Sequence, residues 1–179
     1  FGKGGVDDAE DAEVIVHEYG HAVHDAQVPG FGSTLESGSI GEAWGDYLAV
    51  TVTNVLAPTP DAPCVADWDS TSYTSTVPHC LRRIDGNKHY PADVRGEVHA
   101  DGEIWSRALW DIRLALGHTK ADTLILQSQF SYAPDTTFNA AADATVSTAK
   151  IFAAAGKLTA ANVTAVRKAF TDRGFTVTQ

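Results

Sequence analysis

The 179-residue chain has few cysteines, an excess of acidic over basic residues and no long apolar run. No stretch reaches the roughly 18 consecutive apolar residues of a membrane span, so we expect no transmembrane helix. No signal peptide is visible, which means that the signal of a secreted parent would already have been removed or left out. Lys and Arg number 13 against 23 Asp and Glu, and the net charge of -10 argues against nucleic acid and anionic membranes as partners.

The only two cysteines are Cys64 and Cys80, and the chain has no C-x-x-C pair, which argues against a zinc knuckle. They flank a stretch rich in Ser, Thr, Asp and Pro. A disulfide closing this loop would restrain the unfolded chain by roughly 3 kcal/mol. Such bonds form in extracellular proteins and rarely in cytosolic ones. We therefore predict a Cys64–Cys80 bridge and a secreted protein, with two free buried thiols as the alternative.

Composition and the positions of proline and glycine predict one mostly helical domain over residues 1–179. The hydrophobic content of 44% and charged content of 20% are ordinary for a globular protein of this length. Five prolines between residues 58 and 96 indicate a long irregular region. Gly117, Gly156 and Gly174 stand where helices should stop. We expect helices near residues 8–28, 36–57, 97–116, 120–131, 136–155 and 159–173, and a short extended end at 175–177.

The segment His17-Glu18-Tyr19-Gly20-His21 has the pattern H-E-x-x-H within an apolar helical period. Residues i and i+4 lie on one face of a helix, so both imidazoles can bind a single metal ion. The glutamate beside the first histidine can reach a water on that metal, which is the metalloprotease arrangement. The alternative is a surface helix with solvated histidines. We interpret His17 and His21 as zinc ligands and Glu18 as the general base.

A third ligand is expected from the following helix. Glu42 lies 21 positions after His21, which leaves room for one helix to end and a second to return. Glu42 and Asp46 are four residues apart and project from one face. Glu42 can bind the ion, while Asp46 can accept the free ring N–H of a ligating histidine. The alternative is that both are ordinary polar positions on an amphipathic helix.

H-E-Y-G-H followed by G-E-A-W-G-D-Y-L-A resembles the thermolysin-like and fungalysin-like zinc metallopeptidases, the gluzincin group, and the fungalysin side is the closer match. The resemblance implies the fold of their helical C-terminal catalytic half. It implies His17, His21 and Glu42 as zinc ligands and Glu18 as base. It also implies Asp46 as the partner of a zinc histidine, His17.

The resemblance assigns a second group of residues around Val98-His99. A valine–histidine pair in these families supplies the histidine that stabilises the oxyanion, and His99 matches it. A carboxylate a few residues upstream should hold the ring, and of Asp93 and Glu97 we favour Asp93. Arg82, in preference to Arg83, matches an arginine that binds the substrate carbonyl; two solvated arginines are the alternative.

Val14 and Leu81 would line an apolar pocket for the residue after the cleaved bond. Thermolysin relatives also carry a tyrosine donor between the two motif helices, and this chain has none there. Tyr73 and Tyr90 are the substitutes left open. Glu13 matches one calcium carboxylate of the thermolysin type, but its distal partners are not recovered. We therefore favour a solvated helix start over a calcium site for the acidic residues 7–13.

These observations predict a secreted zinc endopeptidase acting on proteins or peptides. The resembled enzymes have a β-rich domain ahead of the first motif, which forms one wall of the cleft, and we expect that part to lie outside this chain. This motivates the alternative of a zinc-bearing domain that binds protein or peptide without turnover, or of a fragment that needs its N-terminal half.

Overall fold

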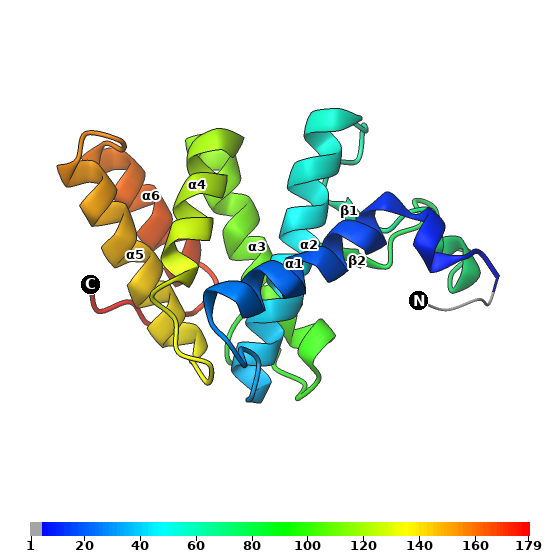
Figure 1. Cartoon of the computed structure of the whole chain (residues 1–179), viewed down its shortest axis with the longest axis horizontal. Coiled ribbons are helices and arrows are strands. Elements are labelled where there is room, and N and C mark those ends of the chain that lie inside the picture. The colour runs from blue at the N-terminus through cyan, green and yellow to red at the C-terminus, as the bar shows by residue number, and fades with distance from the viewer. Residues whose placement is uncertain (1–4) are drawn as a thin grey trace.

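The computed structural model describes residues 5–179, and this part of the chain is mainly α-helical, as predicted (Figure 1). None of its helices is both long and apolar enough to cross a membrane. The helices are α1 (Ala12–Gln27), α2 (Leu35–Leu56), α3 (Val98–Leu116), α4 (His118–Gln129), α5 (Phe138–Ala154) and α6 (Ala160–Thr171).

The first helix begins four residues later than predicted, because two aspartates cap in succession. The Asp7 side chain accepts a hydrogen bond from the Ala9 N–H and closes a short 3-10 turn, η1 (Asp8–Glu10). Asp11 is extended, with φ of -88° and ψ of 115°, and its side chain accepts from the Glu13 N–H. An aspartate in this conformation is a favoured N-cap, so α1 starts after it.

The other helix ends lie close to the predicted ones. Thr34 and Ser37 form a reciprocal capping box at the start of α2. Gly117, Gly156 and Gly174 all have positive φ, the conformation in which glycine ends a helix without steric cost. Their expected role as helix stops is therefore confirmed.

The irregular region holds two short strands, β1 (Cys64–Val65) and β2 (Arg82–Arg83), and a 3-10 turn, η2 (Asp69–Ser72). The strands pair antiparallel, with Cys64 opposite Arg83 and Val65 opposite Arg82. Cys64 and Cys80 are joined by a disulfide, which confirms the predicted bridge. Bridge and strand pair together hold Arg82 against the helices.

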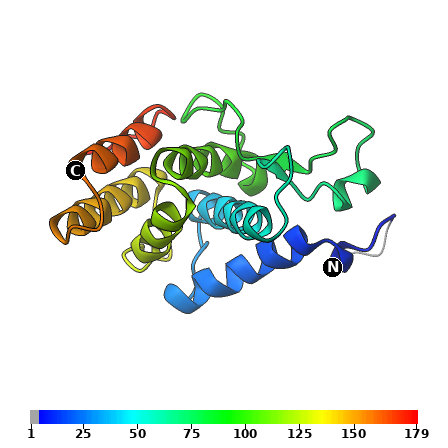
Figure 2. The same cartoon turned by 90° about the horizontal axis from the view of Figure 1, so that it is seen from above.

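Helix α2 is central to the site because α1 packs on one of its sides and α3 on the other (Figure 2). Beyond α2, helices α4 and α6 pack against α3, and α5 packs against both α4 and α6. The core contains Trp44 and Tyr47 of α2, Trp105 of α3, and Phe138 and Phe170 of the last two helices. Helix α1 lies at the edge of this assembly (Figure 2).

Candidate metal centre

Helix α1 brings its two motif histidines together. His17 is buried and His21 is half-buried, and their Nε2 atoms are 3.2 Å apart. Glycines make this approach to α2 possible. A Cβ on Gly45 would lie 2.6 Å from the His17 ring, and one on Gly20 would lie 3.2 Å from the Gly45 Cα. The imidazole of His17 therefore occupies space that any larger residue at position 45 would fill.

Glu42 of α2 meets both histidines. Its Oε2 atom is 3.2 Å from His17 Nε2, and its Oε1 atom is 3.7 Å from His21 Nε2. Zinc bonds to His N and carboxylate O of about 2.0–2.2 Å imply ligand–ligand distances of about 3.3 Å in a tetrahedron. Glu42 Oε2 is also buried, and His17 Nε2 and His99 Nε2 each lie 3.2 Å from it. The three side chains fit a tetrahedral zinc ion by spacing and by donor type.

Asp46 lies one turn after Glu42, where it binds the far side of the His17 ring. The distance from His17 Nδ1 to Asp46 Oδ1 is 2.9 Å. A carboxylate only accepts, so Nδ1 carries the proton and Nε2 faces the other two ligand side chains. Asp46 is 2% exposed and receives two further hydrogen bonds from Arg82, at 2.7 and 2.8 Å.

The ion pair with Asp46 occupies the guanidinium of Arg82, which the sequence had assigned to the substrate carbonyl. Its guanidinium is largely buried, and it forms a bidentate ion pair with the carboxylate that orients His17. It also lines the cavity beside the candidate metal ligands. Arg83, the alternative, pairs with Asp61 and Asp85 and is not part of that wall. Arg82 therefore contacts Asp46, and Asp46 contacts His17.

The charges around His17 favour its protonated form when no metal is bound. Burial alone would lower the pKa of His17, but hydrogen bonds to Asp46 and Glu42 outweigh it and raise the pKa to about 9. Burial of Glu42 is likewise outweighed by His17 and His99, which lower the pKa of that carboxyl. His21 differs, because burial and the neighbouring His17 lower its pKa. A metal ion that binds His17 Nε2 would therefore have to displace a proton.

We expect the metal-free chain to lose stability as the pH rises. The folded-state pKa of His17, about 9, lies above its ordinary value of 6.5. The stabilisation is therefore complete below about pH 6.5 and is lost as the pH passes through about 9, a change on the order of 3 kcal/mol. Urea unfolding of chelator-treated protein between pH 6 and 10 measures it. His17→Asn should flatten the profile, and an equal decline in that variant would contradict the assignment.

His99 of α3 also approaches Glu42. Its Nε2 atom is 3.2 Å from Glu42 Oε2. Helix α3 approaches closely because a Cβ at Gly102 would lie 3.0 Å from the Ser39 carbonyl oxygen. The predicted ring partner is wrong, since His99 Nδ1 donates to Glu97 Oε1 at 2.6 Å. Hydrogen bonds from His99 and Ala100 lower the pKa of Glu97 to about 2.

Helix capping explains the correction from Asp93 to Glu97. Glu97 is the N-cap of α3, and its side chain accepts from the His99 and Ala100 N–H groups, which brings its carboxylate to the His99 ring. Asp93 instead accepts from the His89 N–H within a preceding turn. Asp101 accepts from the Arg95 and Gly96 N–H groups and holds that turn in place. The sequence signal for Glu97 was its position just before the Val98-His99 helix start.

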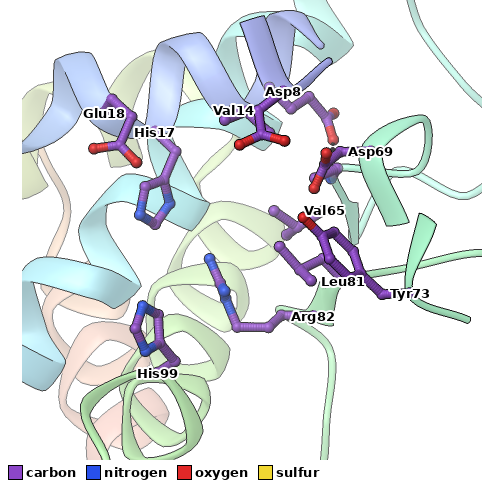
Figure 3. Close-up of a pocket in the computed structure, with 12 residues that line it drawn as sticks. Asp8, Val14, His17, Glu18, Val65, Asp69, Tyr73, Leu81, Arg82 and His99 are labelled. Carbon is purple, nitrogen blue, oxygen red and sulfur yellow. Dashed lines mark hydrogen bonds between the residues drawn. The ribbon is translucent and has the colours of Figure 1, made fainter. Parts of the chain in front are cut away.

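A cavity of about 250 Å³ opens beside these residues (Figure 3). Figure 3 shows Glu18 next to His17 on α1, with Arg82 and His99 across the opening. Its walls include Val14 and Leu81, the two residues predicted to line a pocket together. The remaining lining residues are Asp8, Glu13, Val65, Ala66, Asp69 and Tyr73.

The two tyrosines considered as substitutes for the missing donor, Tyr73 and Tyr90, lie in different places. Tyr73 lines the cavity, whereas Tyr90 packs against Phe138 and Phe175 and donates to Glu36. Tyr90 is thereby removed from the site.

The interpretation of residues 7–13 as a solvated helix start is wrong for its last two acidic residues. Asp11 is 5% exposed, and its second oxygen accepts from the Asp69 N–H. Glu13 accepts from the Thr53 hydroxyl at 2.8 Å and from the Ala66 N–H at 2.6 Å. Burial raises the pKa of Glu13. Each carboxylate oxygen of Asp11 and of Glu13 thus accepts a hydrogen bond from the protein.

Comparison with known proteins places this geometry in context. The chain matches the family model of the fungalysin metallopeptidases (M36) over residues 4–178. Over 127 residues it is 29% identical to Extracellular metalloproteinase 4 of Trichophyton rubrum, a match covering 63% of this chain and 19% of the relative. The corresponding protein of Trichophyton soudanense is 28% identical, with 63% and 31% covered. Extracellular metalloproteinase 2 of Arthroderma otae is 28% identical over 112 residues, with 57% and 18% covered. The chain therefore spans less than a third of the length of these relatives.

Proposed function

Because this chain belongs to the fungalysin family of metallopeptidases, we propose that it carries the metal centre of a secreted zinc endopeptidase. The observation that carries the proposal is the convergence of His17, His21 and Glu42, with ligand atoms all within 4.8 Å of one another. Two imidazoles and one carboxylate are the donor set of a catalytic zinc site with an open fourth position. The names of the relatives support secretion.

Zinc, when bound here, acidifies a water toward neutrality and polarises the scissile carbonyl. Glu18 stands beside His17 at the cavity and takes the proton of the attacking water, then delivers it to the leaving amine. In its imidazolium form His99 carries a proton on both ring nitrogens, and Nε2 then donates to the negative charge that develops on the carbonyl oxygen. Glu97 fixes the His99 ring through Nδ1.

Asp46 and Arg82 act on the ligand His17 rather than on the substrate. The carboxylate of Asp46 holds Nδ1 protonated, so that Nε2 presents its lone pair to the metal. Arg82 keeps this buried carboxylate ionised and in place. Arg82 also lines the cavity, and this position is the one observation that supports a further role in substrate binding.

A metal assay combined with peptide hydrolysis tests this function. We expect one zinc per chain, and cleavage of casein or of a quenched peptide that a chelator abolishes and added zinc restores. The relatives are longer than this chain, and we propose that another part of the full polypeptide completes the substrate cleft. Zinc retention with no hydrolysis by the chain or by the full polypeptide would contradict the catalytic proposal.

Asp46→Asn is expected to weaken zinc retention by roughly 10–100-fold, the usual effect of removing the partner of a ligating histidine. The amide keeps the shape of the side chain but no longer holds the Nδ1 proton of His17 with a charge. Competition with a chromogenic chelator measures the change. Asp111→Asn, on α3 and paired with Arg107 away from the site, serves as control. An unchanged zinc affinity in Asp46→Asn would refute the role.

A further inference from the structure

Another cavity of about 250 Å³ lies between α3 and α6, on the α3 side of α2 and away from the histidine helix α1 (Figure 2). Its charged lining residues are Arg107 and Asp111 of α3, Lys168 of α6, and Asp172 and Arg173 just after α6. Three of them are cations and two are carboxylates, so one positive charge is in excess. This local balance is opposite in sign to that of the whole chain, whose net charge is -10.

Four of the five charged residues pair with one another and so cancel their charges. Lys168 Nζ lies 2.6 Å from Asp172 Oδ2, and Arg107 Nε lies 2.9 Å from Asp111 Oδ1. Arg173 forms no ion pair with any residue that the structure describes. The excess positive charge of the cavity therefore belongs to Arg173.

Arg173 is buried without a counter-charge. It is 8% exposed, and its Nη1 atom donates only to the neutral amide oxygen of Asn87, at 3.2 Å. Its Nε atom is buried without a hydrogen-bond partner. Two other largely buried arginines, Arg82 and Arg113, both face a carboxylate. A buried charge is costly unless an opposite charge compensates it, so Arg173 is the group in this cavity that calls for an anion.

A second guanidinium is fixed beside the first. Nη1 of Arg107 donates to the carbonyl oxygens of Asp85 and Gly86, next to the Asn87 side chain that receives Nη1 of Arg173. Both arginines are thus held on the same three-residue loop and line the same cavity. Because Nη1 of Arg173 is used by the loop, the edge formed by its Nε and Nη2 atoms is left. The two parallel N–H groups of such an edge match the two oxygens of a carboxylate.

We propose that this cavity is a binding site for a carboxylate, held by the Nε and Nη2 groups of Arg173. A single negative charge neutralises the excess of the lining, whereas a doubly charged phosphate would exceed it and would face Asp111 and Asp172. The carboxylate belongs either to a small free acid or to an acidic residue in another part of the full polypeptide, since the relatives are longer than this chain. The site is independent of the proposed peptidase activity.

An NMR titration of the chain with acetate tests this site, with sodium chloride keeping the ionic strength constant. We expect a saturable shift of the Arg173 Nε–H signal and of the Asn87 and Ala169 amides, and weaker binding of phosphate. Arg173→Lys keeps the charge but loses the two-donor edge, so acetate should bind it roughly tenfold more weakly, the value of one charge-assisted hydrogen bond. Arg167→Lys, the same change on α6 outside the cavity wall, should leave the affinity unchanged.

The same titration on the full polypeptide separates the two sources of the carboxylate. Acetate binding that persists there indicates a free acid. Acetate binding that is lost, together with a larger destabilisation by Arg173→Lys than in the isolated chain, indicates an acidic residue of the polypeptide itself. Loss of acetate binding without that larger destabilisation would overturn the proposal.

Three results on the isolated chain would also overturn it. These are the absence of a saturable acetate shift, equal acetate affinity of Arg173→Lys and the wild type, and tighter binding of phosphate than of acetate. If Arg173→Lys failed to fold, the Nε–H signal of the wild-type chain would decide between binding and no binding.

Discussion

Glu18→Gln should lower peptide hydrolysis by about 10²–10⁴-fold while the zinc remains bound, which is the range expected for loss of a general base. Glutamine keeps the size and polarity of the side chain but cannot take a proton. Glu18 is exposed at the cavity and lies between the two ligand histidines in sequence. It is not itself in the group of converging ligand atoms. Metal content and stability should therefore stay unchanged.

The experiment compares kcat and zinc stoichiometry of Glu18→Gln with those of the wild-type protein and of Glu10→Gln. Glu10 is an exposed glutamate just before α1 and does not line the cavity, so its substitution controls for loss of one negative charge. A pH profile of any residual activity distinguishes loss of the general base from a change in metal coordination. Substantial hydrolysis by zinc-loaded Glu18→Gln would sink the assignment.

Arg82→Met should destabilise the metal-free chain by about 3–5 kcal/mol, because it leaves a buried carboxylate without its cation. Asp46 is 2% exposed and receives two of its hydrogen bonds from Arg82. Methionine replaces the length and apolar volume of the arginine stem, so that packing is largely kept. Arg82→Lys should recover part of the loss, since a single ammonium restores charge but not the bidentate geometry.

Arg83→Met is the matched control for this prediction. Arg83 is the next residue on β2 and also pairs with two carboxylates, but its side chain is 36% exposed. Exposed ion pairs contribute about 0–1 kcal/mol, so the same substitution should have a small effect there. Urea unfolding of the two variants gives the comparison. If both lost equally little stability while Arg82→Met raised only KM, Arg82 would be a substrate-binding residue after all.

The parts of the site that were predictable from sequence depend on local geometry. Spacing alone placed His17 and His21 on one helix face, and Glu42 and Asp46 on another. The apolar period and the glycine stops placed most helix ends within two or three residues. None of this requires knowledge of which helix packs on which.

The parts that were not predictable depend on tertiary contacts or on capping. Glu97 reaches His99 because it caps α3, whereas Asp93 is used in an earlier turn. Arg82 meets Asp46 only because β1 and β2 pair and set it against α2. The burial of Asp11 and the partial burial of Glu13 follow from the packing of residues 66–69 over the start of α1. Each depends on a residue distant in sequence, or on a choice between two nearby carboxylates.

The disulfide restrains the loop that presents Arg82 to the candidate metal centre. Cys80 stands two residues before Arg82. Arg82 donates hydrogen bonds to Asp46, which in turn accepts one from the candidate ligand His17. In a chain whose thiols are still reduced, the loop that presents this arginine is restrained by the short strand pair alone. On the secretory route that we propose for this protein, oxidation of the thiols would add the second restraint on this loop and so complete the support of the candidate ligand His17. For a secreted protein, the candidate metal centre would then reach its final geometry only after the chain has left the cytosol.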